Sequence, residues 1–143
     1  DFQLALGLQG PEAGGRGLAD KIDGFKGMIG KAHERFGGVE YFTTTLREVV
    51  NANEHLWGAI LWHDGEFHVA EPRPIGVLDR IGGGDATVGG ILYGLLKGWD
   101  AERCLRFGWA SGALATTVLT DYAVPADEDQ IWTIWNGNAR IKR

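Results

Sequence analysis

Cysteine and methionine are almost absent from this chain of 143 residues, which contains one of each. A lone Cys104 excludes an intrachain disulfide, so we expect a reducing compartment, the cytoplasm, and a buried thiol that acts as a small hydrophobe. No apolar run approaches the length of a membrane span. No basic cluster accompanies the net charge of −5, which argues against a nucleic-acid surface. We therefore expect neither a membrane nor a nucleic acid as partner.

Glycine, in contrast, is abundant, with 23 residues that fall mostly in pairs and triplets. The composition is otherwise that of a globular protein, with 44% hydrophobic and 23% charged residues. The length suits one domain over residues 1–143. The glycine clusters therefore mark turns and close contacts rather than a low-complexity segment.

The spacing of apolar residues predicts an α/β protein without internal repeats. It predicts the end of a helix within 2–8, a helix over 20–36 and a strand over 39–46. Asp64-Gly65 predicts a type I′ hairpin turn between the β-rich runs of 55–72. Three further helices are expected: one ending near Gly98, one from Asp100 as N-cap to about 118, and one over 127–135. The apolar face of the first should be Val88, Ile91, Leu92, Leu95 and Leu96.

Several other residues have a packing interpretation. Gly108, Gly112 and Ala115 share one side of their helix, where small residues allow another helix to approach closely. The six tryptophans suit core and seam packing better than a platform for stacking bases. His63 and His68 flank the hairpin turn, where a solvated tip is favoured over a metal site.

A glycine triplet followed by an aspartate, "DRIGGGDATVGG", joins an extended apolar stretch to a helix. Successive N–H groups of Gly82, Gly83 and Gly84 at a helix N-terminus can converge on an anion, and the helix dipole favours negative charge there. Asp85 at the same place could take a proton from an attacking hydroxyl. A tight turn with a capped helix explains the pattern equally well. On physical grounds both interpretations stay open.

The same segment resembles the C-terminal signature of ribokinase-like (phosphofructokinase B-type) carbohydrate kinases, in which an Asp is followed, three residues on, by Gly-Ala-Gly-Asp. Here these are Asp79 and the run from Gly82 to Asp85. Together with "TLRE" at 45–48 and "FQLALG" at 2–7, the "DRIGGGDA" form is most similar to 2-keto-3-deoxygluconate kinases. The resemblance implies the C-terminal, nucleotide-binding half of a three-layer α/β/α fold with a β-hairpin, without the N-terminal half and lid.

The resemblance also implies roles for individual residues. Asp85 would be the catalytic base and would contact the substrate, and the N–H groups of Gly82 to Gly84 would form the anion hole. Asp79 would support the turn and the metal–phosphate region. Arg80 is expected at the surface rather than on a phosphate. Further residues would bind ATP (Thr45, Leu46, Arg47, Gly82, Gly84 and Ala115) or the sugar acid (Asp121).

The implied activity is Mg²⁺-supported transfer of a phosphoryl group from ATP to a primary hydroxyl of 2-keto-3-deoxygluconate. The alternatives are another ribokinase- or fructokinase-type sugar kinase, an inactive nucleotide-binding fragment that needs a partner, and an interaction domain with a purely structural turn. We expect the chain alone to be inactive. A complementing N-terminal half or a homo-oligomer would complete it.

Overall fold

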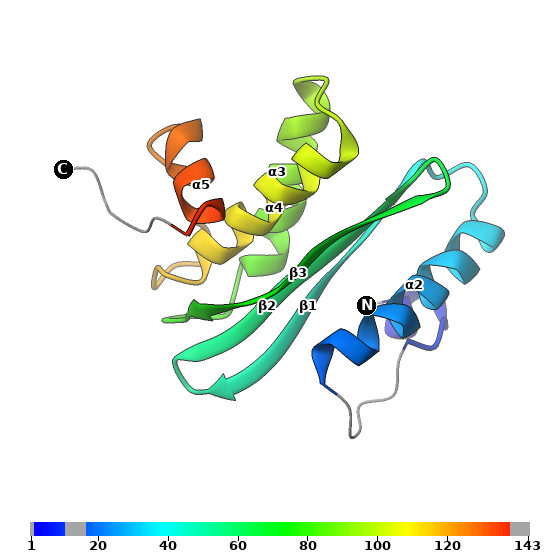
Figure 1. Ribbon diagram of the computed structural model, residues 1–143, viewed down its shortest axis with the longest axis horizontal. Coiled ribbons are helices and arrows are strands. Elements are labelled where there is room, and N and C mark those ends of the chain that lie inside the picture. The colour runs from blue at the N-terminus through cyan, green and yellow to red at the C-terminus, as the bar shows by residue number, and fades with distance from the viewer. Residues whose placement is uncertain (1, 11–16, 138–143) are drawn as a thin grey trace.

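The computed structural model describes residues 2–10 and 17–137, which form three layers (Figure 1). One sheet lies in the middle, with helix α2 on one face and α3, α4 and α5 on the other. The order along the chain is α1 (Phe2–Leu6), α2 (Leu18–Arg35), β1 (Tyr41–Asn51), β2 (Glu54–His63), β3 (Glu66–Gly76), α3 (Gly83–Leu96), α4 (Ala101–Ala115) and α5 (Glu128–Trp135). The α/β class and the three-layer arrangement are confirmed. The proline and paired glycines of "GPEAGGRG" predict a loop, and residues 11–16 of this stretch lie outside the described residues.

The sheet is antiparallel, in the order β1-β2-β3. The expected hairpin is confirmed, with Asp64 (φ 48°) and Gly65 (φ 84°) both in the left-handed region that a type I′ turn requires. The boundary expected for β1 is wrong, because this strand runs on to Asn51 and pairs with β2 over its length. "TLRE" therefore lies inside a strand and not at its end.

Strand β2 is the central strand and is buried on both faces, which explains its almost continuous apolar sequence. Trp57, Ala59 and Leu61 point to the α4 side, where they join one core cluster. Ile60 and Trp62 alternate with them and join a second cluster beneath α2. The sheet thus separates two hydrophobic cores.

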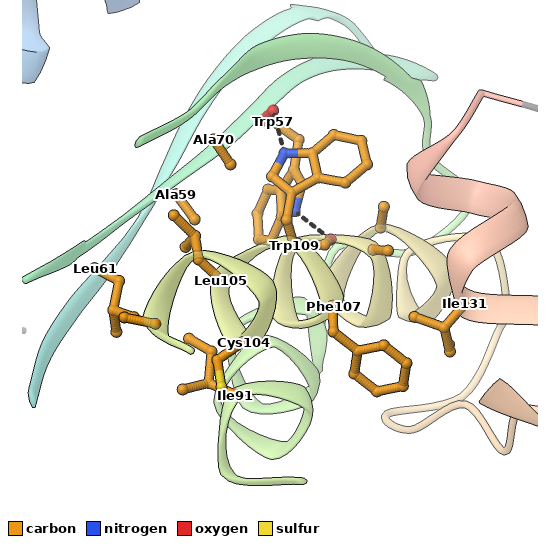
Figure 2. Packing of buried hydrophobic residues seen from close by; sticks show 13 residues of the cluster. Trp57, Ala59, Leu61, Ala70, Ile91, Cys104, Leu105, Phe107, Trp109 and Ile131 are labelled. Carbon is orange, nitrogen blue, oxygen red and sulfur yellow. Dashed lines mark hydrogen bonds between the residues drawn. The ribbon is translucent and has the colours of Figure 1, made fainter. Parts of the chain in front are cut away.

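A pair of tryptophans joins the sheet to α4 (Figure 2). The indole N–H of Trp57 donates to the carbonyl of Trp109 at 3.2 Å, and that of Trp109 donates to the carbonyl of Trp57 at 2.8 Å. Both rings are buried, so each satisfies its polar atom without water. All six tryptophans are buried or half-buried, as the packing interpretation predicted.

The helix ends follow the capping residues of the sequence. Asp100 accepts a hydrogen bond from the N–H of Arg103, and Asp127 accepts one from that of Gln130, so both are N-caps.

A basic side chain fixes α5 against the hairpin. The guanidinium of Arg73 contacts the rings of both Trp109 and Trp135, 3.9 and 4.1 Å from their centroids, and donates to the carbonyl of Trp135.

The apolar face expected for α3 is confirmed only in part. Ile91 is buried and Leu95 packs half-buried against the same core. Val88, Leu92 and Leu96, in contrast, are 45%, 53% and 90% exposed. The buried face consists mainly of small residues, because α4 packs there at close range; its members are Gly83, Thr87, Gly90, Ile91 and Gly94. Short side chains allow the two helix backbones to approach, so the close contact predicted from Gly108 and Gly112 is confirmed.

Candidate functional site

The glycine turn is anchored to the end of α4. The N–H groups of Leu78 and Asp79 donate to the carbonyl of Thr116 at 2.8 and 3.2 Å. The carboxylate of Asp79 accepts a hydrogen bond of 3.0 Å from the N–H of Ile81, which closes a small local turn. Asp79 therefore supports the turn, as predicted.

The three glycines of the turn have different environments. Gly82 has φ 80°, and a Cβ on it would lie 1.9 Å from the carbonyl oxygen of Asp121. A Cβ on Gly83 would lie 3.1 Å from a methyl group of Thr116. A Cβ on Gly84 would have no other atom within 4 Å, and this residue has no positive φ. Packing and backbone geometry thus explain the first two glycines, whereas the third faces open space.

Asp85 lies exposed in the first turn of α3. The N-cap is Gly82, and no side chain caps the helix, so the simple cap that we considered for Asp85 is not formed. Among the described residues, Asp85 has no recorded hydrogen-bond or ion-pair partner. Its carboxylate is accessible at the positive end of the helix dipole.

Behind the turn, a buried threonine packs α3 against α4. The hydroxyl of Thr87 donates to the carbonyl of Gly83 at 2.9 Å. A Cβ on Gly112 would come within 2.1 Å of that hydroxyl oxygen. The edge of Trp57 also lies against Gly83 and Gly112. The N-terminus of α3 therefore rests on packed groups of α4 and β2.

The predicted nucleotide and substrate residues fall into two groups. Thr45 and Arg47 pair with Ala59 and Trp57, so they lie on the face of the sheet that carries α4. Leu46 is fully buried on the α2 side, so its side chain cannot contact a nucleotide. Ala115 is fully buried at the end of α4. The side chain of Asp121 is exposed, and its backbone carbonyl contacts Gly82, which brings it to the turn.

A buried histidine at the start of β2 has two positively charged arginines near it. His55 is 5% exposed and lies on the same face of the sheet as Trp57. Burial lowers the pKa of its imidazole, and the charges of Arg47 and Arg80 lower this pKa further. Two guanidinium groups therefore act on one site near the glycine turn. No motif or residue spacing in the sequence predicts that these two arginines lie near His55.

A pocket of about 400 Å³ opens between α3, α4, α5 and the segment before α5. It meets the turn only at Ala86, and its lining includes Tyr93, Phe107, Leu114 and Ile131. None of the predicted ATP residues lines it. We therefore place the candidate site at the turn and not in this pocket.

The other candidate groups have structural partners. The ring nitrogens of His63 lie within hydrogen-bond distance of the hydroxyl of Tyr41 and the carbonyl of Glu40. The described residues contain no group of three or more His, Cys, Asp or Glu able to hold a metal ion.

Cys104 is buried, and burial raises the pKa of its thiol. None of the described helices is long and apolar enough to cross a membrane.

Residues 57–127, which contain the turn, match the model of the pfkB family of carbohydrate kinases. A 5-dehydro-2-deoxygluconokinase of Clostridium tetani is 42% identical over 52 residues, which are 36% of this chain and 15% of that protein. The chain is related to the pfkB carbohydrate kinases. The match includes Gly82 to Asp85, Ala115 and Asp121, whereas Thr45, Leu46 and Arg47 precede it.

Two solved structures extend the likeness to the fold. A protein from Enterococcus faecalis described as a 2-keto-3-deoxygluconate kinase is 28% identical, with a TM-score of 0.75, over 100% of this chain and 40% of its own. A 2-dehydro-3-deoxygluconokinase of Thermotoga maritima has a TM-score of 0.81 at 24% identity, covering 95% of this chain and 39% of its own. This confirms the ribokinase-like fold. The chain spans about two fifths of the length of each of these two structures.

Proposed function

We propose that this chain is the C-terminal, nucleotide-binding portion of a sugar kinase that transfers the γ-phosphoryl group of ATP to a sugar acid. The observation that carries the proposal is the glycine turn, with its exposed Asp85 and the open space at Gly84. A carboxylate held by packed helices but not engaged in capping is available for chemistry. The match of residues 57–127 to the pfkB carbohydrate kinases supports this proposal.

In the proposed reaction Asp85 takes the proton of the acceptor hydroxyl as its oxygen attacks the γ-phosphorus. The N–H groups of Gly82, Gly83 and Gly84 stabilise the charge on the transferring group, an effect that is often the largest in such reactions. Thr45 and Arg47 approach the nucleotide from the sheet. Leu46 and Ala115 contribute through packing or backbone atoms, because their side chains are buried.

Magnesium ion would accompany the nucleotide. Mg²⁺ retains several waters and is commonly held by substrate phosphates and one or two carboxylates, so it does not require a cage of protein ligands. A turn that carries Asp79 suits this mode of binding, with one oxygen of Asp79 already accepting from Ile81. The ion would neutralise charge on the phosphates.

The proposed acceptor is 2-keto-3-deoxygluconate, phosphorylated at its primary hydroxyl, with Asp121 beside the substrate. The names of the relatives support a deoxygenated keto sugar acid as the class, because they include 5-dehydro-2-deoxygluconate and 2-keto-3-deoxygluconate as substrates of those proteins. A ribokinase- or fructokinase-type acceptor is the alternative. A panel of these sugars in one kinase assay distinguishes them.

A second candidate function is that of a nucleotide-binding part that needs a partner. The apolar stripe of Val88, Leu92 and Leu96 on α3 favours it, because exposed apolar surface commonly marks a site of interaction with another polypeptide. The chain also spans only 40% of the Enterococcus faecalis structure. A complementing polypeptide or a second copy would then supply the rest of the acceptor site.

The test is ATP-dependent phosphorylation of 2-keto-3-deoxygluconate by a chimaera in which this chain replaces the matching part of the Enterococcus faecalis protein. We expect Asp85→Asn to lower kcat by about 10²–10⁴-fold, the usual contribution of a positioned general base, with ATP affinity retained. Asp64→Asn, at the distant hairpin turn, is the matched control. An active chimaera in which Asp85→Asn has full activity would show that Asp85 is not the base.

A further inference from the structure

Two arginines and a buried histidine form a cationic group beside the glycine turn. His55 lies at the start of β2, with apolar Val49 and Ile75 as its partners across the sheet. Arg47 comes from β1, and Arg80 from the segment that leads from β3 to the turn. Both act electrostatically on His55, so three separate segments bring positive groups to the same end of the sheet.

The path of the chain explains why Arg80 is there. The N–H of Val77 donates to the carbonyl of Asn53, which ties the segment after β3 to the turn before β2. Leu78 then binds to Thr116 at the end of α4. Arg80 follows directly and is exposed. The segment therefore presents a guanidinium between the start of β2 and the first turn of α3.

Trp57 links this cationic group to the turn. Arg47 lies opposite Trp57 in the pairing of β1 and β2, and His55 lies two residues before it, so all three share one face of the sheet. The other edge of the Trp57 ring contacts Gly83. Arg47 therefore lies across the strand pair from the indole that contacts the turn.

Neither Arg47 nor Arg80 forms an ion pair with a carboxylate among the described residues. Glu48 pairs with Leu56 and lies on the opposite face of the sheet. Burial lowers the pKa of His55, which disfavours the charged form of its imidazole. An anion with several charges would therefore find two unpaired guanidinium donors there.

We propose that Arg47 and Arg80 together bind the phosphate chain of the phosphoryl donor and align it toward the N–H groups of the glycine turn. This proposal rests on the proposed function. It adds Arg80 to the residues that bind the phosphoryl donor, and it adds a preference of the site for a polyphosphate over a monophosphate. A chain of phosphates reaches from the turn to the arginines, whereas one phosphate occupies only one of these sites.

The experiment is calorimetric titration of the whole chain with ATP, inorganic tripolyphosphate and AMP. We expect the wild type to bind ATP and tripolyphosphate more tightly than AMP. Arg47→Ala and Arg80→Ala should each weaken tripolyphosphate binding by about tenfold or more, equivalent to about 1.4 kcal/mol. Lys31→Ala, which removes an exposed positive charge from α2 on the far side of the sheet, should leave the affinity unchanged.

A second readout keeps local binding apart from misfolding. We expect tripolyphosphate to raise the pKa of His55, followed by its ring NMR signals, because bound anion offsets the charges that lower it. Arg47→Lys and Arg80→Lys, which keep the charge but lose the bidentate fork, should bind with intermediate affinity.

Two results would overturn the proposal: no tripolyphosphate binding by the wild type, or equal binding by the wild type and both alanine variants. Its failure is distinguishable from failure of the proposed function. If the wild type and the alanine variants bind tripolyphosphate equally and the chimaera is active, only the role of the two arginines is contradicted. If the chimaera is inactive but the chain still binds tripolyphosphate through both arginines, only the kinase reaction is contradicted.

Discussion

At the scale of the residue, the turn combines glycines that the fold requires with one that it does not. Gly82 has a positive φ and lies against the backbone of Asp121. Gly84 has open space around it, although alanine is the better residue inside a helix. A less stable residue kept where packing does not need it is typical of a site that a ligand must approach.

This contrast gives a prediction for two matched substitutions. Gly84→Ala should raise the free energy of unfolding by about 0.5–1 kcal/mol, through helix propensity, and weaken ATP binding. Gly82→Ala should lower the free energy of unfolding by about 1–2 kcal/mol from its left-handed backbone alone, with a further loss from the contact with Asp121. Urea unfolding and calorimetry measure both effects. Equal destabilisation by the two variants would contradict the distinction between these glycines.

At the scale of the element, the pairing of α3 with α4 depends on missing side chains. A Cβ on Gly112 would lie 2.1 Å from the hydroxyl oxygen of Thr87 and 2.8 Å from the carbonyl of Gly83. These atoms belong to the turn of α3 that carries Asp85. The spacing of the two helices therefore sets where the proposed base stands.

We predict that Gly112→Ala lowers the free energy of unfolding by about 1–3 kcal/mol, the usual cost of overpacking, despite the gain in helix propensity. Gly89→Ala is the control, because Gly89 is an exposed helical glycine without neighbours within 4 Å of a Cβ. That variant should be slightly more stable than the wild type. Thermal unfolding of the three proteins is the measurement. A Gly112→Ala protein as stable as the control would contradict the close packing.

The same elements show what the sequence could predict. Local signals located the hairpin at Asp64-Gly65 and the helix starts at Asp100 and Asp127, because turns and caps depend on neighbouring residues. The buried face of α3 was not predictable from apolar periodicity, since close approach to α4 selects glycine and threonine there. The charges around His55 come from three distant segments, so only the fold brings them together.

At the scale of the whole molecule, an apolar stripe lies open to solvent on α3. Val88, Leu92 and Leu96 lie one helical turn apart, and further exposed apolar residues follow α4 at Leu119, Tyr122 and Val124. Exposed apolar side chains in this number promote association in water. It is consistent with a chain that spans two fifths of related kinase structures.

We predict that the isolated chain self-associates as its concentration rises, measured by size exclusion with light scattering. Leu92→Glu combined with Leu96→Glu should reduce association and change the free energy of unfolding by no more than about 0.5 kcal/mol, because both side chains are exposed. Leu4→Glu, an equally exposed change on α1, should leave association unchanged. A wild type that stays monomeric at all concentrations would contradict this prediction.

The packing of Arg73 against two indoles affects how far the chain must extend to keep the hairpin side of the molecule stable. One nitrogen of its guanidinium is buried without a partner among the described residues, and burial lowers the pKa of this group. Burying a cation is costly unless other contacts compensate it, so the contacts with Trp109 and Trp135 matter for stability. Deleting α5 would remove Trp135 and its carbonyl. We therefore expect a piece of this protein that ends before α5 to be less stable than one that extends to Trp135, whose carbonyl accepts a hydrogen bond from an arginine 62 positions earlier in the chain.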